Sequence, residues 1–446
     1  MTKVITYGTF DLFHEGHYRL LQRAKALGDY LIVGVTSESF DKARGKLNVV
    51  DSLVTRIENV KKTGFADKIV VEESIGQKYQ DIKKYGVDIF TVGSDWEGQF
   101  DLLKDYCKVV YLPRTKNISS TLKREQMRHI QRVGVIGTGR IANRFMPEAT
   151  LVSGVNHQGV YNPHWESAQR FAEKWSIQPY RTLEALLDDV DLVYIASPHQ
   201  THYDYAKAAL EHGRHVICEK PLALDRAQAE ELFSYAKEHH LIFMEGIKTA
   251  YCPGFHRLLG VVGSGRIGAI RNIEACFTKL ENPQSRELTD TQCGGSLREL
   301  GSYVLLPILK MAGIHYEDVR FESMDDEKGI DLFTKVSLRY PHCLATATCG
   351  LGVKSDGRLL ISGTHGYIVV PAPWWKTEYF EVHYEDPTKI ERFSDSFLGD
   401  GLRYEVSEFL HRLDKDHEAQ DASLLPEESI ALADLMERFG QAHPGT

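Results

Sequence analysis

Two histidines near the N-terminus stand where phosphoryl chemistry could be done. His14 and His17 are three residues apart, Gly16 lies between them, and they follow the short apolar run from Val4 to Gly8. At a helix start this spacing puts both imidazoles on one face, beside free backbone N–H groups and the positive end of the helix dipole. Imidazoles there can stabilise charge that develops on a phosphate. A lone histidine could be a surface or core residue, but the pair with its glycine predicts a phosphate site.

A second set of residues suits hydride transfer with a dinucleotide. Gly137 and Gly139 belong to a GxGxxA turn that follows the strand-like run Val133–Ile136, where such a turn opens a helix and admits a pyrophosphate. At the end of the next strand Asn162 stands where an Asp or Glu would hold the adenosine ribose. The missing carboxylate removes a repulsion against a 2′-phosphate and modestly favours NADP(H) over NAD(H), with His164 as the only cation close by in sequence.

The elements that must position these residues form two βαβ series and a different third part. Short continuous apolar strands alternate with amphipathic helices up to about residue 130 and again to about residue 250, as in parallel sheets covered on both faces. Longer alternating runs follow, at 270–277, 335–339 and 343–349, and predict a largely antiparallel sheet with one covered face before helices over 401–440. The expected fold class is α/β, with domains at 1–129, 130–250 and 251–446. The basic stretch 122–132 is expected to be a solvated helix that joins the first two domains.

Composition narrows the class of protein. The chain has 446 residues, 42% of them hydrophobic and 26% charged, with a formal net charge of −9. An acidic balance disfavours binding to nucleic acid or to an anionic membrane, and no apolar run reaches the ~20 residues of a membrane helix. The N-terminus lacks the apolar core of a signal peptide. Seven cysteines without metal-type spacing indicate reduced thiols, so we expect a cytoplasmic enzyme.

Three motifs in the first domain carry a family resemblance. The stretch 7–17, YGTFDLFHEGH, resembles the signature of the HxGH nucleotidyltransferases. The stretches 92–98, VGSDWEG, and 114–121, RTKNISST, are similar to cytidylyltransferases, especially the glycerol-3-phosphate cytidylyltransferase family. The resemblance covers about residues 1–125. It implies a Rossmann-like domain that condenses CTP with a phosphate ester and releases pyrophosphate, with Mg²⁺ carried by the CTP phosphates and not by protein ligands.

The same resemblance assigns roles to residues of this domain. His14 and His17 would stabilise the transition state at the α-phosphate. The residues implied in CTP binding are Gly8, Thr9, Phe10, Lys46, Asp95, Trp96, Arg114, Ile118, Ser119, Ser120 and Thr121. Lys46 is one of several cations in its loop that the sequence alone does not separate. Gly64 stands where the family usually has an arginine, while Arg56 is retained, so the acceptor phosphate is held differently or the acceptor is not glycerol 3-phosphate.

The rest of the chain resembles the Gfo/Idh/MocA oxidoreductases over roughly residues 131–440. The resemblance is carried by the glycine turn, by SPHQTH at 197–202, by EKP at 219–221 and by GGSLRELGSY at 294–303. It implies a Rossmann domain followed by an α+β open-sheet domain, with Lys220 and Tyr303 as catalytic residues at the substrate carbonyl. Glu299 replaces the family's aspartate, and by the same resemblance it would face the substrate with Tyr303. The residues implied in NAD(P) binding are Gly137, Thr138, Gly139, Arg140, Ile141, Asn162, Ser197, Pro198, His202, Glu219 and Lys220.

The roles of three further side chains near this site remain open. Glu245 ends the last strand of the Rossmann series, where it could approach the nicotinamide or could be paired within the structure. Trp374 and Trp375 could wall the substrate pocket, but core or interface positions are the better interpretation.

Two sets of chemical residues on one chain predict consecutive reactions. The hypothesis is reduction of a keto- or aldose-phosphate to a polyol phosphate with NAD(P)H, then transfer of CMP from CTP to give a CDP-polyol, similar to CDP-glycerol or CDP-ribitol, for teichoic acid or capsule synthesis. Two alternatives stay open: the oxidoreductase half acts on the CDP-linked product, or one half is a non-catalytic nucleotide-binding module. Both families suggest a homodimer or a higher oligomer.

Overall fold

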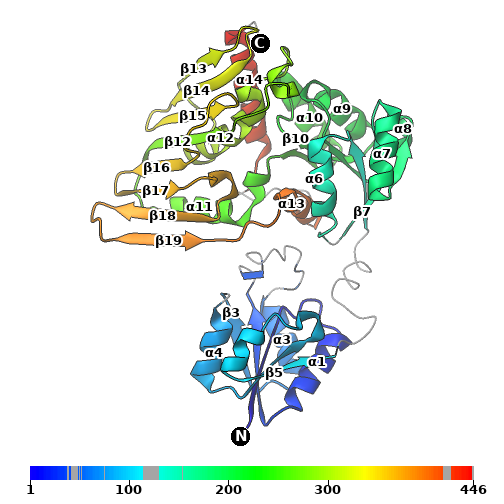
Figure 1. The fold of residues 1–446 in the computed structure, drawn as a ribbon, viewed down its shortest axis with the longest axis vertical. Coiled ribbons are helices and arrows are strands. Elements are labelled where there is room, and N and C mark those ends of the chain that lie inside the picture. Colours follow the sequence, from blue (N-terminus) through cyan, green and yellow to red (C-terminus); the bar gives the residue numbers. More distant parts are fainter. Residues whose placement is uncertain are drawn as a thin grey trace. The chain divides into compact units, whose positions relative to one another are not determined.

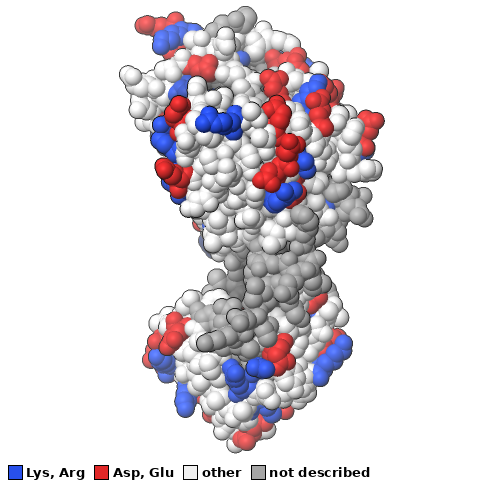
Figure 2. All heavy atoms as spheres, turned by 90° about the vertical axis from the view of Figure 1, so that its right-hand side faces the viewer, with Lys and Arg blue, Asp and Glu red and all other residues white. Residues whose placement is uncertain are grey.

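The computed structural model describes residues 1–37, 40–41, 49, 51, 53–74, 76–113, 130–152, 154–414 and 423–443. The chain forms two compact units, Met1–Ile130 and Gln131–Thr446 (Figure 1). Several residues of the predicted CTP site lie outside the described part, namely Lys46, Arg114, Ile118, Ser119, Ser120 and Thr121, and the side chain of Asp95 is not described either. On the face drawn in Figure 2, acidic and basic side chains are interspersed.

The first unit is a parallel sheet with helices on both faces. Its five strands have the order β3-β2-β1-β4-β5 and all neighbours are parallel. Their bounds are β1 Lys3–Gly8, β2 Tyr30–Thr36, β3 Lys68–Glu72, β4 Ile89–Gly93 and β5 Lys108–Leu112. Among the described residues of this unit, three helices pack on the sheet: α1 Glu15–Lys25 and α3 Leu53–Lys62 against one apolar cluster, α4 Gln77–Tyr85 against another. The strand order reverses at β1 and β4, and ligands bind at such a reversal, beyond the carboxyl ends of the strands.

The second unit begins with a six-stranded parallel sheet of order β11-β10-β9-β6-β7-β8. The strands are β6 Gln131–Ile136, β7 Val155–Tyr161, β8 Gln178–Tyr180, β9 Leu192–Ile195, β10 His215–Glu219 and β11 Phe243–Gly246. The helices between them are α6 Arg140–Ala149, α7 Trp165–Trp175, α8 Leu183–Asp188, α9 His202–Glu211 and α10 Arg226–Glu238. This is the doubly wound order of dinucleotide-binding folds, with the crevice at the ends of β6 and β9.

The start of β6 corrects one expectation. Gln131 and Arg132 were expected in the linking helix, but they lie in the strand, and the remaining residues of that basic stretch up to position 129 are outside the described part. The Arg132 guanidinium donates to Asp191 at 2.9 Å. The strand therefore begins earlier than the apolar pattern suggested, because an ion pair compensates the polar residue.

The predicted antiparallel sheet follows as an eight-stranded sheet of order β13-β14-β15-β12-β16-β17-β18-β19, in which only β12 and β15 pair in parallel. The strands are β12 Ile270–Thr278, β13 Asp318–Asp325, β14 Asp331–Arg339, β15 Leu344–Gly350, β16 Leu359–Gly363, β17 Gly366–Val370, β18 Tyr379–Tyr384 and β19 Ile390–Ser394. The long helices are α11 Pro253–Gly263, α12 Ser296–Ala312, α13 Leu402–Asp414 and α14 Pro426–Ala442. In β14 the side chains of Val336 and Leu338 are buried while Lys335 and Ser337 are exposed, which confirms one covered face, and α12 packs there.

Helix α13 returns to the Rossmann part of this unit. It packs against α6 and against the short helix η4, Lys248–Tyr251, that follows β11. The end of the last parallel strand is thereby enclosed by elements from the beginning, the middle and the end of the unit. Within the described ranges we find no helix long and apolar enough to cross a membrane.

Candidate functional sites

The two predicted histidines lie together at the start of α1. His14 is the N-cap residue, and its Nδ1 accepts the backbone N–H of His17 at 3.3 Å. The two rings stack with centroids 3.8 Å apart and 15° between their planes. His14 is buried and His17 is half-buried. The arrangement places two imidazoles beside the helix N-terminus, where a transferred phosphate would meet both of them and the backbone N–H groups.

The turn before α1 is held in an uncommon backbone conformation. Phe10 and Leu12 have φ values of 54° and 47°. A Cβ on Gly8 would lie 3.0 Å from the Phe10 ring, so a side chain at that position would crowd the turn. The Leu12 N–H donates to Asp51 at 2.9 Å. Phe10 is buried in the core beneath the turn, and its ring centroid lies 5.5 Å from that of His17. Its side chain thus supports the histidines.

A buried arginine ties this turn to the neighbouring strand, a function that sequence reasoning did not assign. Arg56 has no exposed surface, and its Nη1 donates to the carbonyl oxygens of Thr9 at 3.0 Å and Thr36 at 2.7 Å. The same nitrogen lies 3.3 Å from the carboxylate of Asp41, which also accepts the Thr9 hydroxyl at 2.9 Å. Arg56 therefore fixes the backbone of the predicted nucleotide-binding turn to the end of β2. Its spacing on a helix gave no sign that it was buried.

The DWEG segment lies at the end of β4, the strand next to β1. Trp96 is in a short helix, Ser94–Trp96, and its side chain is 44% exposed. Since β1 and β4 are parallel neighbours, this segment and the histidine turn leave the same edge of the sheet. The structure thus brings Trp96 to the edge that carries His14 and His17.

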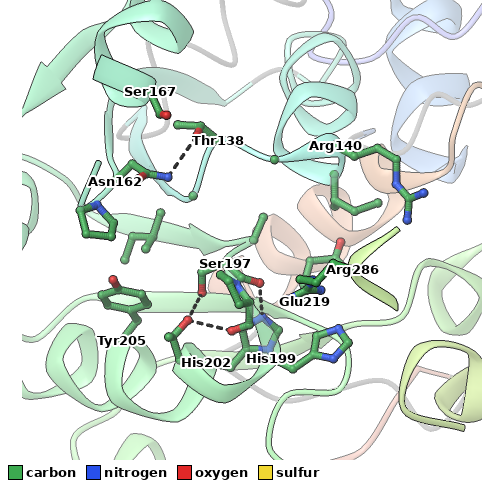
Figure 3. A pocket seen from close by; sticks show the side chains of 18 of the residues that line it. Thr138, Arg140, Asn162, Ser167, Ser197, His199, His202, Tyr205, Glu219 and Arg286 are labelled. Carbon is green, nitrogen blue, oxygen red and sulfur yellow. Dashed lines mark hydrogen bonds between the residues drawn. The ribbon is translucent and has the colours of Figure 1, made fainter. Parts of the chain in front are cut away.

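A cavity of about 520 Å³ lies at the carboxyl ends of the second parallel sheet (Figure 3). Every residue predicted for NAD(P) binding lines it: Gly137, Thr138, Gly139, Arg140, Ile141, Asn162, Ser197, Pro198, His202, Glu219 and Lys220. Thr138 and Asn162 lie at one end of the view, and His199, His202 and Glu219 at the other. The sequence therefore located residues that converge on one cavity.

The glycine turn of this cavity fits a dinucleotide. A Cβ on Gly137, whose φ is 100°, would lie 2.5 Å from the carbonyl oxygen of Ala196, so the turn packs tightly on the end of β9. A Cβ built on Gly139, which caps α6, would have no atom within 4 Å of it. That open space adjoins free N–H groups at a helix start, which is where a pyrophosphate binds.

At the other end of the glycine turn, the ribose-binding position carries no carboxylate. The Asn162 amide donates to the Thr138 hydroxyl at 3.0 Å, and its oxygen accepts the His164 N–H at 2.8 Å. Ser167, on the first turn of α7, also lines the cavity, and Arg170 donates to its hydroxyl at 3.2 Å. Sequence reasoning named His164 as the only nearby cation and missed Arg170, which the i, i+3 spacing on α7 brings to Ser167.

The carboxylate of Glu299 lies near three basic side chains of the cavity. Lys220 Nζ donates to the Glu299 carbonyl at 2.7 Å and lies 3.3 Å from its carboxylate. Arg140 approaches the same carboxylate at 3.5 Å and His199 at 3.8 Å. Burial, followed by the charge of Lys220, holds the pKa of His199 well below its ordinary value, so this imidazole is neutral. Lys220 is thereby held against the first turn of α12.

Tyr303 lies one helical turn after Glu299 on α12. The Lys220 Nζ is 5.8 Å from the centroid of its ring. Burial, followed by the carboxyl groups of Glu219, Glu405 and Glu299, raises the pKa of Tyr303 well above its ordinary value. The phenol is therefore protonated at neutral pH and can donate a proton.

The aromatic residues next to Tyr303 fall into two groups. Phe277 packs edge-on to Tyr303 at 5.5 Å and stacks on Trp375 at 3.6 Å. Trp374 is completely buried and donates from Nε1 to the Cys276 carbonyl at 2.8 Å, so its interpretation as a core residue is right. Trp375 is only half-buried and continues the aromatic wall that Tyr303 begins.

Glu245 lies buried in the protein and does not face the cavity. It is 2% exposed, and its Oε1 accepts the N–H of Leu222 at 3.1 Å. Burial raises the pKa of Glu245 to about 7. It does not belong to the lining of the cavity. No group of three His, Cys, Asp or Glu side chains that could hold a metal ion occurs in the part of the chain that the structure describes.

Three family models match the chain. The cytidylyltransferase-like model matches residues 5–126. The model of the Gfo/Idh/MocA oxidoreductase family, with an NAD-binding Rossmann fold, matches residues 131–247, and the model of the C-terminal domain of that family matches residues 255–369.

Curated relatives divide in the same way. The N-terminal part is similar to the glycerol-3-phosphate cytidylyltransferase of Bacillus subtilis, with 47% identity over 127 residues, 28% of this chain and 98% of that protein. The remainder is similar to the trans-1,2-dihydrobenzene-1,2-diol dehydrogenase of Bos taurus, with 28% identity over 327 residues, 70% of this chain and 96% of that protein.

Among solved structures, the second unit is similar to KijD10, a 3-ketoreductase from Actinomadura kijaniata in complex with TDP-benzene and NADP. The TM-score is 0.61 at 25% identity, and the match covers 70% of this chain and 97% of that one. That crystal carries a tyrosine-to-phenylalanine replacement, and another crystal of the enzyme carries a lysine-to-alanine replacement.

Proposed function

Because the chain belongs to the cytidylyltransferase-like family in its N-terminal unit and to the Gfo/Idh/MocA oxidoreductase family in the rest, we propose that it is a bifunctional enzyme that makes a CDP-polyol. It reduces a keto- or aldose-phosphate with NADPH and then transfers CMP from CTP to the polyol phosphate. The observation that carries the proposal is that one chain holds the stacked pair His14–His17 at a helix start and Lys220 fixed on Glu299 beside a dinucleotide cavity.

In the transferase half, positioning and charge stabilisation supply the catalysis. An oxygen of the acceptor phosphate attacks the α-phosphorus of CTP, the bond to the β-phosphate breaks, and pyrophosphate leaves with Mg²⁺. His14 and His17 stabilise the charge on the α-phosphate oxygens, since their stacked rings flank the start of α1. Arg56 acts on the reaction only through the turn that it holds.

In the reductase half, a dinucleotide held by Gly137, Gly139 and Asn162 would supply the hydride for the carbonyl carbon of the substrate. Tyr303 donates its hydroxyl proton to the carbonyl oxygen, because its pKa keeps the phenol protonated. Lys220 stabilises the charge that develops on that oxygen, and Glu299 holds the ammonium in place through both its backbone carbonyl and its carboxylate. The neutral His199 adds no competing positive charge at this end.

The cofactor proposed is NADP(H). Asn162 brings no negative charge to the ribose position, and the Arg170–Ser167 pair stands on the helix that follows it. A 2′-phosphate would replace the Ser167 contact of Arg170 with a charge-assisted one. In support, the ketoreductase KijD10 is solved with NADP.

One observation supports the reverse order of the two reactions. KijD10 carries TDP-benzene as well as NADP, so a relative of the reductase half accommodates a nucleoside diphosphate in addition to its cofactor. In that order, CMP transfer comes first and the reductase acts on a CDP-linked carbonyl compound. Use of the polyol in teichoic acid or capsule synthesis belongs to the proposal in either order.

The test supplies the full chain with NADPH, CTP, Mg²⁺ and a panel of C3–C6 keto- and aldose-phosphates, and identifies the CDP product by mass. We expect NADPH oxidation without CTP and a CDP-polyol once CTP is added. If a carbonyl phosphate receives CMP from CTP without NADPH, and NADPH is oxidised only once the carbonyl compound is CDP-linked, the proposed order is wrong and the second order holds. If neither activity is found, the function itself is wrong.

A further inference from the structure

Arg286 lines the dinucleotide cavity but takes part in none of the interactions described above. The arginine and lysine side chains of the lining are Arg140, Lys220 and Arg286. Arg140 approaches the carboxylates of Glu287 at 3.2 Å and Glu299 at 3.5 Å, and Lys220 lies 3.3 Å from the carboxylate of Glu299. Within the described residues, by contrast, no carboxylate oxygen lies within 4.0 Å of a guanidinium nitrogen of Arg286. Two of the three cations are therefore paired inside the protein, and the third is left for a ligand.

The backbone that carries Arg286 is fastened to the wall of the cavity at two points. Arg286 begins the short helix η5, Arg286–Leu288, in the loop between β12 and α12. The carboxylate of Glu287 contacts Arg140, the first residue of α6. The carbonyl oxygen of Glu287 accepts the N–H of Gly295 at 2.8 Å, directly before α12 begins. The place of Arg286 thus depends on its neighbours and not on a contact of its own guanidinium, which stays available.

Arg286 lies toward the reactive end of the cavity. Figure 3 shows it at the end where His199 and Glu219 are drawn. The charges agree with this position, since burial and the charge of Lys220 lower the pKa of His199 most, and the charges of His202 and Arg286 add to the same effect. A ligand whose carbonyl oxygen meets Lys220 would therefore have Arg286 on the same side of the cavity.

A guanidinium without an ion pair in a ligand cavity suits an anion. Its planar fork of N–H donors matches two oxygens of a phosphate, and hydrogen bonds of this charge-assisted kind are roughly twice as strong as neutral ones. The phosphates of the cofactor have other places in the proposed complex. The pyrophosphate lies at the start of α6 beside Gly139, and the 2′-phosphate lies beside Ser167 at the far end of the glycine turn. The anion that remains for Arg286 is one that the substrate carries.

We propose that Arg286 binds a phosphate of the reductase substrate while Lys220 meets the carbonyl oxygen. The inference rests on the proposed reductase function and names the residue that selects its substrate class, phosphorylated carbonyl compounds. The phosphate is either the monoester of a keto- or aldose-phosphate or part of the diphosphate of a CDP-linked compound. A carbonyl compound without phosphate leaves the guanidinium in water and gains no binding energy from it.

The experiment follows NADPH oxidation without CTP by the full-length protein and by Arg286→Gln. The probes are dihydroxyacetone phosphate, unphosphorylated dihydroxyacetone and a CDP-linked ketone, with further ketose phosphates up to C6 beside their parent ketoses. We expect Arg286→Gln to lose roughly ten- to a hundredfold in kcat/KM for phosphorylated probes, mainly through KM, and less than about twofold for the others. Arg286→Lys keeps the charge without the fork and should recover part of the loss. A loss confined to the monoesters, or to the CDP-linked ketone, identifies which phosphate is bound.

A binding measurement makes the test independent of turnover. Calorimetric titration of the NADP⁺-loaded protein with dihydroxyacetone phosphate, and separately with inorganic phosphate, gives the affinity for the anion. We expect the Kd of both ligands to rise roughly tenfold or more in Arg286→Gln, while the Kd of NADPH changes less than about twofold.

The controls separate this contact from fold stability, from cofactor binding and from the proposed function. Arg320→Gln removes an exposed arginine of the edge strand β13 that does not line the cavity, and it should change none of these quantities. Equal losses of Arg286→Gln for phosphorylated and unphosphorylated probes would overturn the proposal, as would weaker binding of NADPH alone or an unmodified protein that does not prefer phosphorylated ligands. If no carbonyl compound oxidises NADPH although phosphate binds through Arg286, the reductase function fails and the phosphate contact stands.

Discussion

Replacement of Glu245 by glutamine should remove a pH-dependent loss of stability in the second unit. The carboxyl is fully buried at the end of β11, and burial raises its pKa from 4.5 to about 7. A raised pKa means that the folded state binds the proton more tightly than the unfolded state does. Its stabilising contribution is therefore complete below about pH 4.5 and is lost as the pH rises through 7.

The size of the effect follows from the shift. At 1.36 kcal/mol for each unit of pKa, a change from 4.5 to about 7 corresponds to roughly 3 kcal/mol between pH 4.5 and pH 8. Glutamine has nearly the same shape and can still accept the Leu222 N–H through its Oε1, but it never ionises. We therefore expect Glu245→Gln to be more stable than the unmodified chain at pH 8 by about 2–3 kcal/mol, and close to it at pH 5.

The assay is urea unfolding of the full chain at pH 5, 6, 7 and 8, followed by the fluorescence of the second unit. The quantity measured is the difference in unfolding free energy between variant and unmodified chain at each pH, since other titrating groups cancel in it. Glu238→Gln, an exposed residue of α10, is the matched control and should give a difference near zero throughout. A difference for Glu245→Gln that stays constant from pH 5 to pH 8 would refute the argument from burial.

Three further predictions concern the sites themselves. Tyr303→Phe should lower ketone reduction roughly 100- to 10,000-fold and leave CMP transfer from CTP to a polyol phosphate intact, while His17→Ala should do the reverse, both followed by product mass. A loss of both activities in either variant would contradict two separate sites. Arg170→Gln should raise the KM for NADPH about tenfold without changing that for NADH, and an equal change for both would remove Arg170 from the 2′-phosphate. Arg56→Lys should destabilise the first unit by about 3–5 kcal/mol, because the buried carbonyls of Thr9 and Thr36 lose the guanidinium that they share, and an unchanged unfolding transition would show that the network is dispensable.

Motifs fixed by local backbone geometry were well predicted from the sequence. The glycine turn could be located because Gly137 needs a positive φ and because the end of β9 excludes a Cβ there. The helix start at His14 could be found because its spacing to His17 has meaning only on a helix. The fold class followed from the alternation of apolar runs and helices, which the short-range sequence pattern encodes directly.

What the sequence could not give depends on contacts between distant segments. Arg56 is an ordinary helix arginine until the turn after β1 and the end of β2 place their carbonyls around it. Arg132 was assigned to a linker because its partner, Asp191, lies far along the chain. In both cases the polar side chain is compensated by residues that no local pattern could identify.

The chemistry of the acceptor bears on the order of the two reactions. The transferase half needs a phosphate monoester as its nucleophile, since the attacking oxygen must come from the acceptor phosphate. If the reductase half binds that same monoester, reduction must come before CMP transfer, because the transfer converts the monoester into part of a diphosphate. The ratio of kcat/KM for a keto-phosphate to that for its CDP-linked form measures this order directly. A ratio well above one in the unmodified protein places reduction first. A ratio below one would mean that CMP transfer precedes reduction.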